Sequence, residues 1–262
     1  MQKKTFSLFL LITLIFPFIA VDFAYAQSAD DYFKQGIIHY DKARLVRAKY
    51  DASSGNVKAL EAFEKKEEKA LNMAINAFLE VIKISPDRAS AYNNLGVLYD
   101  DKVSFLGGDK EKFEQIEGYY TKAITLTPDS SKAYSNRGIL YWRYRNRDKA
   151  INEQNLDQAI RDYTKAIELL PNYSKAYSNR GIANSNFYNS KHNIEQAMKD
   201  FSKAIELDPQ NTEAYYALAQ TYSAENDVER STKELNKAIE LDPRYKDLAA
   251  MFFRPKAEFD YE

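Results

Sequence analysis

Five prolines divide most of the chain into segments that resemble one another. Each proline ends a similar phrase, FLEVIKISP, YTKAITLTP, YTKAIELLP, FSKAIELDP or LNKAIELDP, in which apolar residues recur at helical spacing. Because proline stops a helix, each phrase predicts the end of one helix, and the repetition predicts a chain of repeated helical units. The prolines are Pro86, Pro128, Pro171, Pro209 and Pro243, at successive spacings of 42, 43, 38 and 34 residues.

A second phrase follows each of the first four prolines: AYNNLGVLY, AYSNRGILY, AYSNRGIAN and AYYALAQTY. In the second of these, Tyr134, Gly138 and Tyr141 lie on one helix face at i, i+4 and i+7. A small residue flanked by large aromatic residues one turn away on the same helix indicates close packing against another helix, since a glycine in a helix interior otherwise costs ~1 kcal/mol. Each unit is therefore predicted to be a pair of antiparallel helices, A and B.

These marks resemble the tetratricopeptide repeat (TPR) family, whose 34-residue unit places aromatic, small and proline residues at fixed points. The resemblance implies an all-α fold, a right-handed superhelical solenoid of antiparallel helix pairs with about five repeats and a C-terminal capping helix. Residues 212–245 fit the 34-residue length without insertion, and their marks are Tyr215, Leu218, Ala219, Tyr222, Ser231, Leu235, Ala238 and Pro243. The other repeats carry insertions between helix A and helix B. The expected units are a divergent first repeat with a long helical insertion at 27–88, then 89–130, 131–173, 174–211 and 212–245, with a capping helix and tail at 246–262.

The first 26 residues have the layout of a secretory signal peptide. Lys3 and Lys4 precede an apolar stretch, and Ala24-Tyr25-Ala26 places small residues at the −3 and −1 positions of a cleavage site. We expect cleavage after Ala26 and a periplasmic or secreted protein; the alternative is an uncleaved N-terminal anchor. No later segment is apolar enough to span a bilayer, so no membrane insertion is expected after cleavage.

Composition argues against several other classes of function. The 37 basic and 38 acidic residues nearly cancel, whereas a nucleic-acid binder needs an excess of positive charge. The chain has no cysteine, and its two histidines, His39 and His192, are far apart in sequence, so neither a thiol nucleophile nor a histidine-rich metal site is expected. The sequence therefore predicts no enzyme, no cofactor and no metal.

The candidate binding residues lie on the predicted A helices. Asn94, Asn136 and Asn179 share one repeat position, two residues before a glycine, and stacked repeats would align them in a ladder. Lys132 and Lys175 lie four residues before two of them, on the same helix face. An amide side chain can both donate to and accept from the backbone of an extended peptide, and a lysine would favour a carboxylate. Trp142 and Arg143 are expected to line the same groove.

The resemblance implies a peptide-binding groove on the concave side, and it partly matches the carboxylate clamp of chaperone-binding family members. Those members have Lys and Arg four residues apart where this chain has Lys175 and Asn179. The alternative for the asparagines is a hydrogen bond to a neighbouring helix. Arg137 and Arg180, which replace the apolar residue expected before glycine, are predicted to stabilise the fold by reaching a carboxylate at the edge of the packed helices.

The sequence thus favours an exported interaction scaffold. It would bind extended segments of other proteins in its concave groove and assist the assembly of an envelope complex. The alternative is a self-associating structural protein of the cell envelope, which would use its C-terminal segment or its long first-repeat helices. In a scaffold, by contrast, the C-terminal segment is expected to fold back and cap the last repeat with its apolar residues Leu248, Met251, Phe252 and Phe253.

Overall fold

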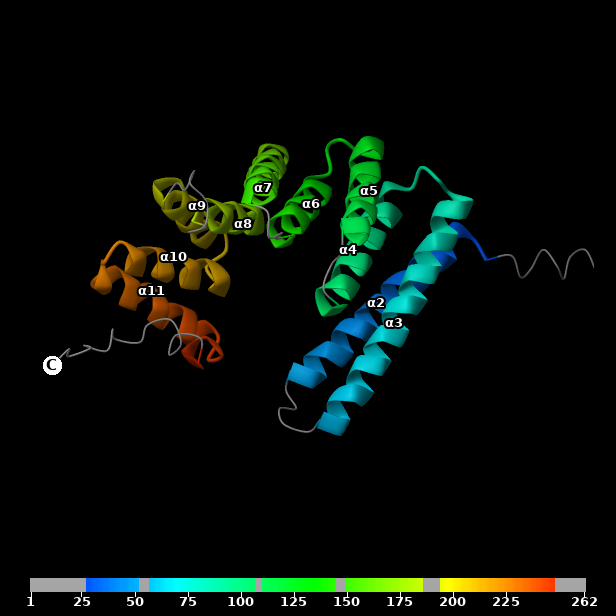
Figure 1. Ribbon diagram of the computed structural model, residues 1–262, viewed down its shortest axis with the longest axis horizontal. Helices are drawn as coiled ribbons and strands as arrows, with labels where there is room; N and C mark the ends of the chain where they lie inside the picture. Colours follow the sequence, from blue (N-terminus) through cyan, green and yellow to red (C-terminus); the bar gives the residue numbers. More distant parts are fainter. Residues whose placement is uncertain (1–26, 52–56, 107–109, 145–148, 186–193, 248–262) are drawn as a thin grey trace, which may run out of the picture. The chain divides into compact units, whose positions relative to one another are not determined.

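The computed structural model describes residues 27–51, 57–106, 110–144, 149–185 and 194–247, and within these ranges it contains helices and no strand (Figure 1). The fold is an all-α solenoid of helix pairs, as predicted. The chain forms two compact units, residues 1–102 and residues 103–262. The helices are α2 (Ala29–Asp51), α3 (Val57–Ile84), α4 (Ala89–Leu106), α5 (Lys110–Leu126), α6 (Ser131–Arg143), α7 (Lys149–Leu169), α8 (Ser174–Asn184), α9 (Ile194–Leu207), α10 (Thr212–Ala224) and α11 (Val228–Leu241).

The first unit is built on the long pair α2 and α3, which lie side by side (Figure 1). Helix α3 has 28 residues, so it is about 42 Å long. The rings of Phe33 and Phe78 meet edge to face with centroids 5.3 Å apart, and Phe78 is fully buried. Arg47 Nε lies 2.8 Å from Oε1 of the buried Glu67. Apolar burial and one shielded ion pair therefore join α2 to α3.

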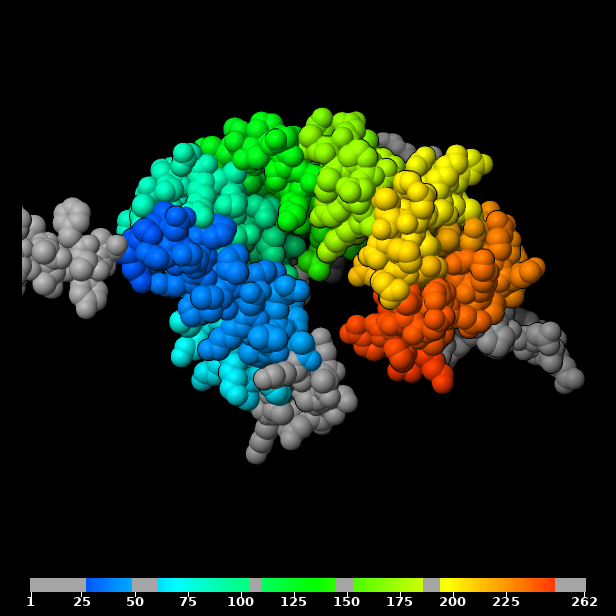
Figure 2. All heavy atoms as spheres, turned by 180° about the vertical axis from the view of Figure 1, so that it is seen from behind, coloured from blue at the N-terminus to red at the C-terminus, as the bar shows by residue number. Residues whose placement is uncertain are grey.

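The second unit contains three complete helix pairs, α6 with α7, α8 with α9, and α10 with α11. Each B helix also contacts the A helix of the next pair, and the A helices α6, α8 and α10 contact one another in turn. The space-filling view shows α9, α10 and α11, coloured yellow to red, as one continuous surface (Figure 2). Helix A of one repeat therefore lies between two B helices.

The repeated prolines end the B helices as the sequence predicts. Helices α3, α5, α7, α9 and α11 each end two residues before a repeat proline, which lies in the following turn. Side chains then cap several helices that follow: Ser130 accepts from the amide of Ala133, and Asn211 from the amide of Ala214. Proline and cap together fix where one helix stops and the next begins.

The repeat glycines permit close approach of helices A and B. A Cβ atom built at Gly138 would lie 2.7 Å from Tyr163 Cε1, and one built at Gly181 would lie 2.6 Å from Phe201 Cε1. Both aromatic rings are buried. The predicted close packing of helices at the glycine is confirmed at these two positions, and the ring that meets the glycine comes from helix B rather than from the tyrosines of helix A.

The predicted signal peptide lies outside the described residues, and so does most of the predicted capping helix. Residues 245–247 are helical, and the ring of Tyr245 packs 4.9 Å from the ring of Tyr216 in α10. Across the described ranges, each helix is too short or too polar to cross a bilayer.

Candidate functional site

The A helices α6 and α8 present the same polar pattern on one face. Lys132 and Lys175 are exposed near the start of each helix, and Asn136 and Asn179 lie half-buried one turn later. Because α6 contacts α8, the two Lys-Asn pairs lie on adjacent helices of the second unit. This part of the predicted ladder thus lies on neighbouring elements, and its binding role stays a prediction.

Both asparagines lie half-buried on their helices. Asn136 takes part in interactions within the protein. The Nδ2 atom of Asn179 is buried and has no hydrogen-bond acceptor among the described residues. A buried donor without an acceptor is costly, and rotation of the amide about its last torsion exchanges the positions of nitrogen and oxygen. The Asn179 amide therefore has an unmet hydrogen-bonding capacity among the described residues.

Trp142 and Arg143 occupy different positions on α6. Arg143 is exposed and follows Asn136 by seven residues, which returns it to the same helix face. Trp142 follows by six residues, about 120° around the helix, and it packs half-buried against the core cluster that includes Leu156 and Tyr163. Of these two residues, helical geometry favours Arg143 for the face that carries Asn136.

Asn94 belongs to α4 in the first unit, where it is half-buried. Its place in a ladder with the other asparagines is a prediction. In α10 the equivalent positions hold Ala217 in place of asparagine and Glu213 in place of lysine, and Glu213 is exposed. The Lys-Asn face of the second unit is therefore confined to α6 and α8, and the next A helix, α10, has an acidic residue at the lysine position.

A buried ion pair lies behind this face in the third repeat, and we call it the first arginine clasp. Arg137 donates from Nε to Asp162 Oδ2 at 2.8 Å and from Nη2 to Oδ1 at 2.9 Å. Its Nη1 reaches Thr121 Oγ1 on α5 at 3.1 Å, and Gln158 donates to Asp162 at 3.3 Å. Burial lowers the pKa of Arg137, but the hydrogen bond and charge of Asp162 outweigh it and raise the pKa overall. The clasp joins helix A to its own B helix and to the preceding one.

The fourth repeat repeats this arrangement as a second arginine clasp. Arg180 donates to both oxygens of Asp200, from Nε at 2.8 Å and from Nη2 at 2.7 Å. Its Nη1 reaches Thr164 Oγ1 at 3.2 Å, and Gln196 donates to Asp200 at 3.0 Å. The hydrogen bond with Asp200 raises the pKa of Arg180. Both carboxylates are buried, whereas the sequence predicted partners at the edge of the fold.

Each clasp arginine also lies near the tyrosine that precedes it by three residues. The Arg137 guanidinium carbon is 5.8 Å from the ring centroid of Tyr134, and that of Arg180 is 5.7 Å from the ring centroid of Tyr177. These distances lie within the range of cation–π attraction. A clasp therefore combines a carboxylate, a hydroxyl and an aromatic face around one guanidinium.

The acidic partners of the clasps were not identified from the sequence. A signal was present in the sequence. An acidic residue stands nine residues before each of the last three repeat prolines, and a hydroxyl residue stands seven residues before Pro128, Pro171 and Pro209. Those offsets, taken together with the arginine before glycine, would have paired Arg137 with Asp162 and Arg180 with Asp200.

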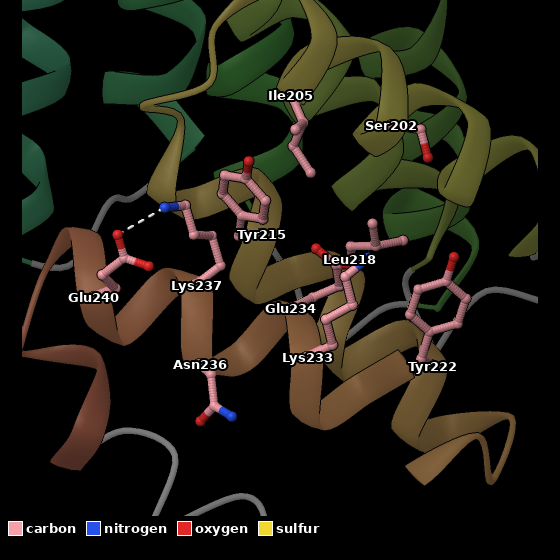
Figure 3. Close-up of a pocket in the computed structure, with 10 residues that line it drawn as sticks. All are labelled: Ser202, Ile205, Tyr215, Leu218, Tyr222, Lys233, Glu234, Asn236, Lys237 and Glu240. Carbon is pink, nitrogen blue, oxygen red and sulfur yellow. Dashed lines mark hydrogen bonds and ion pairs between the residues drawn. The ribbon is translucent and has the colours of Figure 1, made fainter. Parts of the chain in front are cut away.

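The last repeat has an open pocket of about 580 Å³ at the corresponding place (Figure 3). Its walls come from α9, α10 and α11, and Leu218 of α10 takes the place of the clasp arginine. The lining residues are Ser202, Ile205, Tyr215, Leu218, Tyr222, Lys233, Glu234, Asn236, Lys237 and Glu240.

Candidate metal-ligating side chains lie apart from one another in the described part of the chain. Histidine and acidic side chains there do not gather in groups of three that could hold a metal ion. His192 lies outside the described residues, and His39 is half-buried in α2.

The pairs, their glycine contacts and their proline ends define a solenoid of the tetratricopeptide-repeat type. A family model described as tetratricopeptide repeat matches residues 190–252. The fold resembles a thermophilic TPR protein of Thermus thermophilus, with a TM-score of 0.57 and 18% identity over 82% of this chain and 97% of that chain.

Two further solved structures have similar folds. One is MamA, with a TM-score of 0.52 and 21% identity over 74% of this chain and 99% of that chain. Another is MamA 41-end from Desulfovibrio magneticus RS-1, with a TM-score of 0.51 and 17% identity over 78% of this chain and 97% of that chain. No curated protein matches the sequence. At these identities the structural likeness establishes the fold alone.

Proposed function

We propose that the protein is an interaction scaffold that binds an extended segment of a partner protein along the A-helix face of α6 and α8. The observation that carries this proposal is the repeated Lys-Asn pair on two contacting helices. Within this face, Asn179 has a donor that lacks an acceptor among the described residues. Stacked helix pairs expose a continuous surface suited to extended peptides, and that general property of solenoids supports the proposal.

The charges of the face favour an acidic partner segment. Lys132, Lys175 and Arg143 are exposed on α6 and α8. A lysine ammonium attracts a carboxylate, and the asparagine amides pair with a peptide backbone whatever its sequence. We therefore expect the partner segment to carry Asp or Glu side chains or a terminal carboxylate. Its affinity should be modest, because an extended peptide loses conformational entropy on binding.

A pull-down with quantitative mass spectrometry tests this proposal. The site variant carries Asn136→Ala, Lys175→Ala and Asn179→Ala. The matched control carries Gln115→Ala, Gln154→Ala and Lys165→Ala, which also removes two amides and one lysine, from exposed positions on α5 and α7. Circular dichroism checks that both variants fold.

The proposal predicts that proteins captured by the wild type are lost with the site variant and kept with the control. An unchanged set of captured proteins with a folded site variant would exclude this face as the binding surface.

Export to the cell envelope is part of the proposal. Its support is the sequence of residues 1–26, with two lysines, an apolar stretch and Ala24-Tyr25-Ala26 before Gln27. Mass spectrometry of the protein recovered from its native envelope fraction tests it. A chain that begins at Gln27 agrees with export and cleavage, whereas a retained Met1 in the cytoplasmic fraction contradicts both. In that compartment the scaffold would assist assembly of an envelope complex.

Self-association is the second candidate, favoured by exposed apolar residues on α2. Ile38 and Leu45 are each 63% exposed and lie seven residues apart, so they share one face of the helix. Light scattering of the wild type and of an Ile38→Glu/Leu45→Glu variant tests this candidate. An oligomeric wild type that the variant converts to a monomer would support it, and a monomeric wild type would exclude it. The same measurement with and without residues 246–262 tests the C-terminal segment.

A further inference from the structure

The last repeat keeps the acidic residue, the hydroxyl and the aromatic ring of an arginine clasp but lacks the arginine, and Arg230 stands where the clasps have glutamine. Leu218 precedes the small residue Ala219 in α10, as Arg137 and Arg180 precede glycines in α6 and α8. Leu218 lines the pocket between α9, α10 and α11. The chain thus contains two repeats in which an arginine occupies this position and binds a carboxylate, and one repeat in which the position holds leucine beside an open pocket.

The acidic group of the clasp is retained. Glu234 stands nine residues before Pro243, as Asp200 stands nine residues before Pro209, and its side chain is 15% exposed. The Nζ atom of Lys233 lies 3.6 Å from Glu234 Oε1, which is too long for a hydrogen bond, and the Lys233 side chain is 80% exposed. The bidentate guanidinium that holds Asp200 has no counterpart at Glu234 among the described residues.

The hydroxyl and the aromatic face are retained as well. Ser202 on α9 takes the place of Thr164, which accepts a hydrogen bond from Arg180 in the second clasp. Tyr215 on α10 takes the place of Tyr177, the ring beside Arg180. Figure 3 shows Ser202, Tyr215 and Glu234 on the three helices that surround the pocket.

Arg230, the described arginine nearest to Glu234 in sequence, has other interaction partners. Arg230 lies one turn before Glu234 on α11, but its Nε donates to Asp227 Oδ2 at 2.6 Å and its guanidinium carbon lies 4.4 Å from the ring centroid of Tyr222. At the other end of the pocket, Lys237 Nζ is 2.8 Å from Glu240, so its charge is matched (Figure 3).

We propose that this pocket binds an arginine side chain supplied by a partner polypeptide, with Glu234 as its carboxylate, Ser202 as its hydroxyl acceptor and Tyr215 as its aromatic face. We call it the arginine pocket. The planar guanidinium suits it better than an ammonium, because it can meet a carboxylate with two parallel hydrogen bonds and still reach a third acceptor. The two internal clasps show this geometry.

The arginine pocket is separate from the Lys-Asn face. Its walls are the B helices α9 and α11 on either side of α10, whereas the proposed peptide-binding face lies on α6 and α8. The two sites also differ in the group that each would receive, since the lysines of the face would receive a carboxylate and Glu234 of the pocket would receive a guanidinium. The pocket therefore adds a second point of recognition, which can be tested whether or not the face binds peptide.

A titration of the full chain, followed by nuclear magnetic resonance, tests the proposal. The probe is the peptide acetyl-Gly-Ser-Arg-Ser-Gly-amide, and the controls are the same peptide with lysine or with citrulline, the neutral isostere of arginine, at the centre. We expect saturable shifts of the Ser202, Tyr215 and Glu234 amides with the arginine peptide. The lysine peptide should bind about tenfold more weakly, and the citrulline peptide should not saturate. Equal binding of the arginine and citrulline peptides would overturn the proposal.

Two variants should impair the arginine pocket in different ways, one by removing its charge and the other by filling it. Glu234→Gln removes the charge and should weaken binding of the arginine peptide at least tenfold, whereas Glu206→Gln, at an exposed ion pair on α9, should leave it unchanged. Leu218→Arg places a guanidinium in the pocket from within the chain and should abolish binding. Unchanged binding by either folded pocket variant would contradict the proposal.

The melting temperature of Leu218→Arg provides an independent readout. Leu218 is only 4% exposed, and an arginine at a buried apolar position without partners is strongly destabilising. If Glu234 and Ser202 receive the new guanidinium, the melting temperature should stay within roughly 5 °C of the wild type. A drop well beyond that would show that the pocket cannot hold an arginine.

The chain's own C-terminal residues include Arg254. An Arg254→Ala variant shows whether the arginine comes from a partner. Unchanged affinity for the arginine peptide supports a partner, whereas an increase of about tenfold would assign the pocket to the chain's own arginine and overturn the proposal of a partner.

Discussion

The buried carboxylates of Asp162 and Asp200 should contribute more to the stability of the fold than the many exposed charges on its surface. Asp200 is 2% exposed and accepts two hydrogen bonds from one guanidinium, whereas pairs such as Lys203 and Glu206 lie open to water. A buried charge that loses its partner keeps its desolvation cost, while an exposed charge is solvated again. The clasps therefore should dominate the response to charge-removing substitutions.

Removing one side of a clasp should destabilise the protein strongly. We expect Asp200→Ala to lower the free energy of unfolding by about 3 kcal/mol, because Arg180 is left without its carboxylate. Glu206→Ala, the control, should change it by less than about 0.5 kcal/mol. Urea unfolding followed by circular dichroism measures both. Equal effects of the two substitutions would show that the clasp does not stabilise the repeat.

The contact of Gly181 with Phe201 makes a second prediction at the scale of single residues. Gly181→Ala should destabilise by about 1–3 kcal/mol, because the added Cβ would lie 2.6 Å from a buried ring. Gly118→Ala provides the control, since a Cβ at that position of α5 meets no atom within 4 Å. There, alanine should stabilise by up to about 1 kcal/mol through helix propensity. The same denaturation experiment measures both changes, and a stabilising Gly181→Ala would contradict this close packing of glycine against the ring.

At the scale of the element, helix ends are set by local side chains. Helix α11 begins after Asp227, whose carboxylate accepts from the amide of Arg230 at 3.0 Å. That backbone hydrogen bond, followed by the Arg230 side chain, lowers the pKa of Asp227 below its ordinary 3.8. A carboxyl group whose pKa is lower in the folded state stabilises that state at pH values above its ordinary pKa. This stabilisation is lost as the pH falls through the pKa of the folded state.

The cap therefore predicts a pH-dependent difference between two proteins. Asp227→Ala should melt at a lower temperature than the wild type at pH 7, and the difference should shrink below about pH 4 as Asp227 is protonated. Melting curves recorded between pH 2 and pH 7 measure this. A difference that persists undiminished at pH 2 would show that the cap does not act through its charge.

The sequence predicted the elements well because their ends and contacts are local. Proline offsets placed the ends of α3, α5, α7, α9 and α11, and the glycine within each A helix indicated close packing against another helix at Gly138 and Gly181. The clasps were missed because they join residues 16 to 25 positions apart on three helices. Their geometry depends on how repeats stack, which no single repeat specifies.

At the scale of the whole molecule, repeat stacking makes stability a local property. In a solenoid each repeat contacts only its neighbours, so a damaged repeat weakens its surroundings more than distant ones. Native-state hydrogen exchange of Asp200→Ala should show faster exchange in α8, α9 and α10 and unchanged exchange in α2 and α3, which belong to the other compact unit. Uniform acceleration across both units would indicate one cooperative body instead.

The central claim is that the face of α6 and α8 binds a partner segment. Site-specific photo-crosslinking tests it most directly, with a benzophenone amino acid placed at Lys132 or Lys175 on this face and, as controls, at the exposed Lys165 or Lys199 on α7 or α9. We predict that one partner protein is crosslinked from positions 132 and 175 and not from positions 165 and 199. Crosslinking of that partner from the control positions alone would contradict the proposed binding face.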